Sequence, residues 1–467
     1  MKFKPLHINT DDPFKSDLLE RKEEIINLSL LALNVNSPAV IAIDSRWGTG
    51  KTTFIKLWEQ HLKTQNISSL YFNAWETDFS DDPLVSFLGE MNEGLKNLIG
   101  TSEETNEAWE KTKAAGKQIA KRSIPALLRV GTAGLIDTDK IIEEEMVRAA
   151  GLLAGDALDS YLQQKGAISE FHNALTSFVE NSANGKQLVI FVDELDRCRP
   201  NYAIELLERI KHIFNIEGLV FVLALDKDQL GHSIKAVYGN GIDSDGYLRR
   251  FIDFEYQLNK PDISNYIESL LLSLNLEEFF GPRNQYRELQ YDQEHLKKVF
   301  IMLASGLGLS LREIEYFLAS INIAIRTAKE NQYVFPALLV FLIVAKYFKP
   351  DEYQRYISDD GDERELIGYL YQIVPEKKRS DNFECALIEG FLIAAKNGHF
   401  RKSKSTIFEK HKDILQDEEL DYKDRQYSDT VVGVVNRPSS SGQGVNLKSL
   451  IERIEWISKF EFLNDGD

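Results

Sequence analysis

The sequence predicts an α/β fold: a three-layer domain on a parallel five-stranded sheet, followed by a mostly helical C-terminal part. Two observations lead to this prediction. Between residues 39 and 258 apolar runs alternate with helical segments, and the runs at 188–192 and 219–225 are apolar at every position. Continuous apolar runs are typical of strands that helices cover on both faces. After residue 261 the apolar spacing is helical to about residue 348.

The elements of the first part follow from local patterns in chain order. A helix is expected at 17–33, strands at 39–44, 69–75, 188–193, 219–226 and 254–258, and a further helix at 54–62. Residues 82–184 show helical patterning without a convincing strand, so we expect a long helical insertion in the core domain. Arg122, Pro125 and Arg129 argue against a membrane hairpin there.

We expect the chain to divide into a core domain at 1–260 and two helical regions, 261–349 and 350–467, the last of unknown role. Ser310 and Glu313 have the spacing of a capping box, which predicts that a helix starts at residue 311.

Three shorter patterns complete the C-terminal half. The apolar run 337–345 is too short to span a bilayer and predicts a buried helix. The polar segment 416–444 is expected to be an exposed linker. Asn446 is expected to cap a final amphipathic helix. His399 and His411 lack a metal-spaced companion, so we expect them at the surface.

Charge and cysteine content exclude several classes of protein. A net charge of −18 argues against a protein that coats nucleic acid or anionic membrane by charge alone. Two cysteines without metal-ligand spacing fit a reducing compartment. No apolar run follows the N-terminus as in a signal peptide. We therefore expect a cytoplasmic protein without a membrane span.

The first expected strand runs into a loop with the spacing of a phosphate-binding motif. Its residues are Ser45, Arg46, Trp47, Gly48, Thr49, Gly50, Lys51, Thr52 and Thr53. Backbone N–H groups, the positive end of the next helix and one lysine together hold a triphosphate. In this motif Lys51 reaches the β- and γ-phosphates and the Thr52 hydroxyl ligates Mg²⁺. Ser45 replaces the usual first glycine, while Gly48 and Gly50 still allow close backbone approach.

Two acidic residues, Asp193 and Glu194, stand at the end of the expected strand 188–193. In phosphoryl hydrolysis such an aspartate can hold Mg²⁺ through water, and the glutamate can orient and deprotonate the attacking water. Alone, the pair is typical of a solvated turn; together with the lysine loop it predicts hydrolysis of a nucleoside triphosphate. Asp226, after the strand at 219–225, has two open roles: sensing the γ-phosphate or water, and capping the next helix.

Three segments together resemble the KAP family of P-loop NTPases. They are Ser45–Thr52, Phe72–Glu76 and Asp193–Pro200, and Tyr247–Ile252 resembles a further segment of that family. The resemblance covers about residues 11–317 of the chain.

The resemblance implies a bacterial ATPase of the additional-strand class, with ATP and Mg²⁺ as cofactors and a helical lid at 261–349. It also implies a role in signalling or anti-phage defence. Many members carry transmembrane helices between the two nucleotide motifs, whereas the corresponding residues 108–162 are charged here.

The same resemblance carries site roles over to this chain. Asp17 and Arg21 lie in a segment that resembles the one beside the adenine in relatives. Trp75 is expected at the end of a strand beside the phosphate-loop strand, where a site role and core packing are both open. Candidates for a nucleotide-contacting arginine are Arg197, Arg249, Arg250 and Arg312.

The function expected from these observations is an ATP-hydrolysing switch. ATP would clamp the lid onto the core, and we expect a homo-oligomer and a separate effector or trigger protein as partners. One alternative is a small-molecule or nucleotide kinase, and another is a nucleotide-gated scaffold without turnover. A nucleic-acid-dependent ATPase also stays open through basic clusters at 117–122, 377–379 and 401–404, although such clusters are typical of solvated helix ends.

Overall fold

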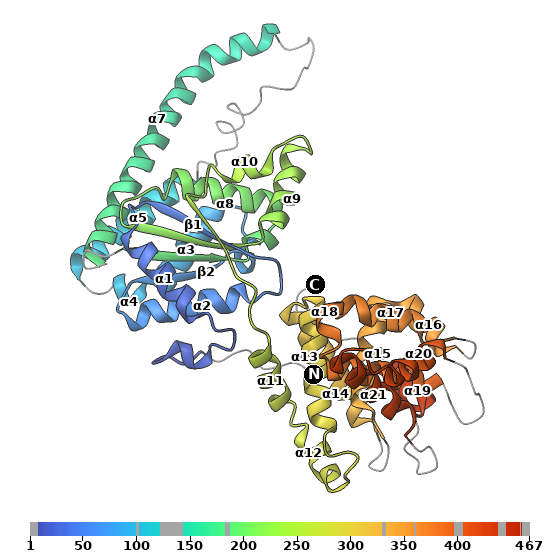
Figure 1. Cartoon of the computed structure of the whole chain (residues 1–467). Coiled ribbons are helices and arrows are strands. Elements are labelled where there is room, and N and C mark those ends of the chain that lie inside the picture. Colours follow the sequence, from blue (N-terminus) through green and yellow to red (C-terminus); the bar gives the residue numbers. More distant parts are fainter. Residues whose placement is uncertain are drawn as a thin grey trace. The chain divides into compact units, whose positions relative to one another are not determined.

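The computed structural model describes residues 8–99, 102–121, 143–182, 187–328, 333–358, 361–396, 405–437, 445–457 and 459 (Figure 1). The chain forms two compact units. One spans Leu6–Pro261, and the other is built from Asp262–Asp467.

The first unit contains all five predicted strands, each within two residues of its expected ends. They are β1 (Ala39–Asp44), β2 (Ser69–Asn73), β3 (Leu188–Asp193), β4 (Leu219–Leu225) and β5 (Phe254–Gln257). Its helices are α1 (Lys22–Asn34), α2 (Lys51–Thr64), α3 (Pro83–Gly94), α4 (Lys96–Ile99), α5 (Glu103–Lys121), α7 (Glu143–Ser182), α8 (Pro200–His212), α9 (Lys227–Tyr238) and α10 (Ser244–Leu248).

All strand pairs in the sheet are parallel, and the order is β2-β3-β4-β1-β5. The strand β4 therefore lies between the phosphate-loop strand β1 and the acid-bearing strand β3. This is the additional strand that the family resemblance implies. The expected place of 69–75 beside the phosphate-loop strand is wrong, because β2 pairs with β3 at the edge of the sheet.

Helices cover both faces of the sheet, as the continuous apolar runs predict. On one face Phe191 packs its ring against Trp58 of α2, with centroids 5.2 Å apart. On the other face Phe87 of α3 packs against Phe72 of β2, with ring centroids 5.0 Å apart. Each large side chain buried in this way contributes roughly 1.5–3 kcal/mol relative to exposure. The two layers of helices thus hold the sheet in place, and its carboxyl edge carries the phosphate loop and the acidic pair described above.

The described parts of the insertion are helical, as predicted. Helices α5 and α7 pack along each other, and Trp109 is fully buried with its ring 5.1 Å from Phe178. Arg122, Pro125 and Arg129 lie outside the described residues, as do 401–404 and His399. In the described ranges, no helix combines the length and the apolar composition that crossing a membrane requires.

The second unit consists of helices. They are α11 (Ser264–Ser273), α12 (Glu277–Phe280), α13 (Asp292–Leu307), α14 (Leu311–Arg326), α15 (Pro336–Phe348), α16 (Pro350–Ile357), α17 (Arg364–Ile373), α18 (Glu376–Arg379), α19 (Phe383–Lys396), α20 (Thr406–Gln416), α21 (Tyr422–Val435) and α22 (Leu447–Ile457). A single apolar core runs from Ile267 to Ile457. The expected lid and the C-terminal region therefore share one core.

Three local predictions for this unit are confirmed. The capping box of Ser310 and Glu313 starts α14, with both reciprocal bonds formed. Residues 337–345 lie in the buried helix α15. The Asn446 side chain accepts a hydrogen bond from the Ser449 N–H at the start of α22.

The exposed linker expected at 416–444 is wrong for much of its length. Helix α21 occupies Tyr422–Val435, because Tyr427, Val431 and Val434 are spaced to bury one face in the core. The many charged residues at 417–425, just before these positions, obscured that spacing in the sequence.

The surface position expected for His411 is also wrong. Its Nε2 lies 2.9 Å from a carboxylate oxygen of Glu389, and its Nδ1 lies 2.9 Å from Ser428 Oγ. Tyr371 and Tyr427 also donate to Glu389, which is fully buried. The serine–histidine–glutamate order resembles a catalytic triad, but Ser428 is 1% exposed and inaccessible to a substrate. The group is a hydrogen-bonded core network.

Candidate nucleotide site

The carboxyl ends of neighbouring strands bring the two sequence motifs to one edge of the sheet. The backbone register pairs Asp44 with Leu225, Ala224 with Asp193, and Asp193 with Asn73. The loop that follows β1 and the acidic residues at the end of β3 therefore lie at the same edge of the sheet. This edge is where open parallel sheets bind ligands.

The phosphate loop has the backbone that its glycines predict. Gly48 and Gly50 have φ of 75° and 90°, and Gly50 precedes the first turn of α2. A side chain is strained in this region, whereas glycine is not. Ser45 needs no such conformation, and its Oγ donates to Thr49 Oγ1 at 2.8 Å. Its side chain therefore stabilises the loop.

Lys51 is buried at the start of α2 and turns back onto its own loop. Its Nζ donates to the carbonyl oxygens of Ser45 and Arg46, the latter at 3.2 Å. Burial lowers the pKa of Lys51, while the carboxylates of Asp196, Asp226, Asp193 and Asp44 oppose that effect. The ammonium group of Lys51 thus lies inside the loop, where its hydrogen bonds go to backbone carbonyl oxygens.

Trp47 connects the loop to two acidic residues that follow the strands β3 and β4. Its indole Nε1–H donates to Asp196 Oδ2, and its backbone N–H donates to Asp226 Oδ2 at 3.2 Å. The other oxygen of Asp226 accepts from the Gln229 N–H and caps α9. Of the two roles left open for Asp226, capping is confirmed and phosphate sensing stays a prediction. Sequence reasoning missed Asp196 as the partner of Trp47.

The acidic residues Asp193 and Glu194 are held by side chains of β2. Tyr71 OH donates to Asp193 Oδ2 at 3.0 Å, and Asn73 Nδ2 donates to Glu194 Oε2 at 3.2 Å. Arg197 pairs with the other carboxylate oxygen of Glu194 at 2.9 Å. Burial raises the pKa of Glu194, and Arg197 opposes that rise. Glu194 is therefore a desolvated carboxylate at a fixed position, as a general base requires.

Glu194 also has a left-handed backbone, with φ of 59°. Residues held in that region are uncommon and cluster at functional sites. Sequence reasoning gave Tyr71 and Asn73 no role, although Asn73 ends a strand that neighbours β3. The position of Asn73 at the carboxyl end of β2 is the sequence feature that could have identified it as a site residue.

The arginine candidates lie in different environments. Arg197 contacts Glu194, and its guanidinium lies 5.5 Å from the ring centroid of Trp75. Trp75 is 38% exposed and begins a short 3-10 helix, so neither the strand end nor the core packing expected for it is found. Arg249 and Arg250 are exposed after α10.

Arg312 is exposed in the first turn of α14, in the second unit. Its expected role in nucleotide sensing, like the γ-phosphate roles of the other arginines, stays a prediction.

Asp17 and Arg21 organise the start of α1. Asp17 accepts hydrogen bonds from the N–H groups of Leu19 and Lys22. Arg21 is buried, pairs with Glu24 at 2.8 Å and donates to the Asn259 carbonyl at 2.6 Å. These contacts connect α1 to the segment after β5. The expected position beside an adenine stays a prediction.

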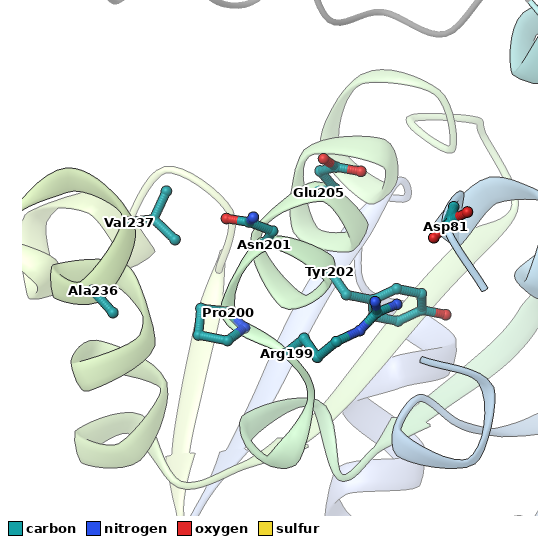
Figure 2. A pocket seen from close by; sticks show the side chains of 8 residues that line it. All are labelled: Asp81, Arg199, Pro200, Asn201, Tyr202, Glu205, Ala236 and Val237. Atoms are coloured by element: carbon teal, nitrogen blue, oxygen red, sulfur yellow. The ribbon is translucent and has the colours of Figure 1, made fainter. Parts of the chain in front are cut away.

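Described residues of this unit line a cavity beside the phosphate loop and another between α8 and α9. One, of about 570 Å³, is lined by Arg46, Trp47 and Asp226 together with residues of α9 and α10, and so adjoins the phosphate loop. The other, of about 420 Å³, lies between the start of α8 and the end of α9 (Figure 2). Arg199 lines this second cavity, and its guanidinium donates to the Ser80 carbonyl at 2.9 Å. Only the first cavity includes phosphate-loop residues.

The residues present fit Mg²⁺ and a triphosphate. Thr52 is half-buried in the first turn of α2, and Asp193 ends β3, so a hydroxyl and a carboxylate are available as the hard oxygen ligands that Mg²⁺ prefers. Thr53 follows in the same turn. The cation Lys51 and the left-handed glycines complete a loop suited to phosphate.

Comparisons with known proteins agree with this geometry. The model of the KAP family P-loop domain matches residues 23–328. The phage T7 exclusion protein of Escherichia coli strain K12 is 21% identical over 253 residues, which are 51% of this chain and 32% of that protein. The chain thus spans about a third of the length of that relative.

Solved structures give only a weak likeness. The ORC2 protein of Aeropyrum pernix in its ADP form is 15% identical, with 98% of this chain and 96% of that chain covered and a TM-score of 0.32. Cdc6p from Pyrobaculum aerophilum is 12% identical, with 92% and 96% covered and a TM-score of 0.29. The assignment rests instead on the strand order and on a family match that covers more than half of the chain, including both nucleotide motifs. The chain belongs to the KAP family of P-loop NTPases.

Proposed function

We propose that the chain is an ATP-hydrolysing switch. The observation that carries this proposal is the arrangement at the sheet edge: a phosphate loop with a buried Lys51, and a desolvated Glu194 held by Asn73 and Arg197. A scaffold without turnover has no need for a positioned general base. A kinase seldom needs one for water, since its substrate supplies the attacking hydroxyl.

ATP, when bound, would supply the γ-phosphoryl group, and Mg²⁺ would neutralise the negative charge of the phosphate oxygens. Lys51 would exchange the carbonyls of Ser45 and Arg46 for phosphate oxygens. Thr52 and Asp193 would hold the metal ion, and the carboxylate of Glu194 would accept the proton of the attacking water. Arg197 forms an ion pair with that carboxylate, and this pairing would limit how far the Glu194 side chain can rotate toward the water.

The biological role we propose is anti-phage defence. It is supported by the name of the relative, the phage T7 exclusion protein, which matches half of this chain. Homo-oligomerisation, a separate effector or trigger protein, a helical lid formed by residues 261–349 and a cytoplasmic location belong to the same proposal.

Phosphate release from ATP tests the proposed activity. The wild-type chain should release phosphate with Mg²⁺ present, and Lys51→Ala should not. Glu90→Gln, which changes an exposed carboxylate of α3, is the matched control and should keep the wild-type rate. Robust release by Lys51→Ala would contradict the site, and a phosphorylated product without free phosphate would indicate a kinase. Phage plating on cells that express the wild type or Lys51→Ala tests the role in defence.

A further inference from the structure

A cavity of about 420 Å³ in the second unit is separate from the nucleotide site. It lies among the starts of α13 and α15, helix α19 and the residues just after α21. Its volume is within the range of small-molecule sites, about 300–1,000 Å³. All of its lining residues belong to the second unit.

Aromatic rings form one wall of this cavity. Tyr333 and Phe335 are stacked, with centroids 5.8 Å apart and planes 26° apart. Phe391 packs edge-on against Phe335 at 5.6 Å, and the Arg437 guanidinium lies 5.7 Å from the Phe391 centroid. Flat faces of this kind bind the face of a planar ring, and a guanidinium can stack on such a ring as well.

Two arginines and two acidic residues line the cavity, and two further arginines lie close to its lining residues. Arg287 and Arg437 line it and are exposed. Arg283 and Arg453 are buried close to each other, and the pKa of Arg453 is lowered by burial and then by Arg283. Arg453 also donates to the carbonyl of Tyr333, a wall residue. Local positive potential of this kind attracts anions.

Glu288 and Asp292, which line the cavity, compensate the charge of these four arginines only in part. Asp292 is 9% exposed, and burial raises its pKa to about 7. Its Oδ2 has no hydrogen-bond partner, and neither has Nη1 of Arg453. An unsatisfied buried polar group costs roughly 1–3 kcal/mol. Simple core packing explains the aromatic rings but leaves these two polar atoms unexplained.

We propose that this cavity binds a nucleoside monophosphate. The base would stack on the wall of Tyr333 and Phe391, and its N–H groups would face the Asp292 carboxyl group. The phosphate would pair with Arg287 and Arg437, whose guanidinium groups match phosphate oxygens. The site would bind independently of the phosphate loop.

Equilibrium dialysis of the full-length Lys51→Ala chain tests this proposal, because this variant lacks the lysine with which the phosphate loop would bind phosphate groups. The probes are AMP, GMP, CMP and UMP, their nucleosides, and inorganic phosphate. We expect saturable binding of at least one monophosphate near one equivalent per chain. Its nucleoside and inorganic phosphate should each bind at least about tenfold more weakly, because each lacks one half of the recognised group.

Two exposed cavity residues and one matched control complete the test. Arg287→Gln and Arg437→Gln should each weaken binding about tenfold or more, the loss expected for a charge-assisted hydrogen bond. Arg364→Gln, whose side chain is 69% exposed outside the cavity, should bind as before. The proposal is overturned if no monophosphate binds the Lys51→Ala chain, if both cavity variants bind within twofold of it, or if the nucleoside binds equally well. Introduced into the chain that keeps Lys51, both cavity substitutions should leave phosphate release at the wild-type rate, so failure here is distinct from failure of the ATPase.

Discussion

Replacing Trp47 by phenylalanine isolates one anchor of the phosphate loop. The change keeps an aromatic ring but removes the indole N–H that donates to Asp196. Asp196 is 6% exposed, and burial raises its pKa while Lys51 and Trp47 lower it. Trp47→Phe therefore leaves a buried carboxylate with one donor fewer.

The size of the effect follows from the kind of bond that is lost. A hydrogen bond to a charged group contributes roughly 1.5–3 kcal/mol, which corresponds to a factor of about 10–150 in a local opening equilibrium. The second anchor, from the Trp47 backbone to Asp226, remains. We therefore expect hydrogen exchange of the amides at 45–53 to be about 10-fold faster or more, with little change in peptides of α8.

A double-mutant cycle decides whether this specific bond is responsible. In an Asp196→Asn background the charged acceptor is already gone, so Trp47→Phe should accelerate loop exchange by clearly less than in the wild type. The reasoning is refuted if Trp47→Phe accelerates exchange equally in both backgrounds, or if loop exchange in the single variant is unchanged.

Three further predictions concern other parts of the chain. Gly50→Ala should weaken ATP binding, measured by calorimetry, about tenfold or more, because a side chain at φ of 90° is strained; normal affinity would contradict the loop geometry. His411→Ala should lower the unfolding free energy by roughly 1–3 kcal/mol, seen in thermal unfolding, because fully buried Glu389 loses a partner. Phosphate release should fall on acidification at a pH above the ordinary pKa of glutamate, since burial raises the pKa of Glu194 and only its carboxylate accepts a proton; in a pH–rate profile, a rate that is flat down to pH 4.5 would contradict this assignment.

The sheet and the phosphate loop could be predicted because their causes are local. A strand buried on both faces must be apolar at nearly every position, as β3 and β4 are, and left-handed positions favour glycine, as at Gly48 and Gly50. Each of these constraints determines the residue types at a few consecutive positions, so it can be recognised in the sequence.

The contacts that hold the site could not be predicted in the same way. Trp47 and Asp196 are 149 residues apart, and Asn73 and Glu194 are 121 residues apart. Such pairs form only when the strand order is known, and nothing in the nearby sequence marks them. His411 was misplaced for the same reason, because its partners Glu389 and Ser428 come from two other helices.

The nucleotide retained by a Glu194→Gln variant tests the central claim most directly. The wild-type and variant chains are incubated with ATP and Mg²⁺, desalted and acid-extracted, and the nucleotides are separated. If Lys51 binds the phosphates and Glu194 activates the water, the variant retains ATP while the wild type yields ADP and phosphate. ADP formed by the variant at the wild-type rate would contradict the account.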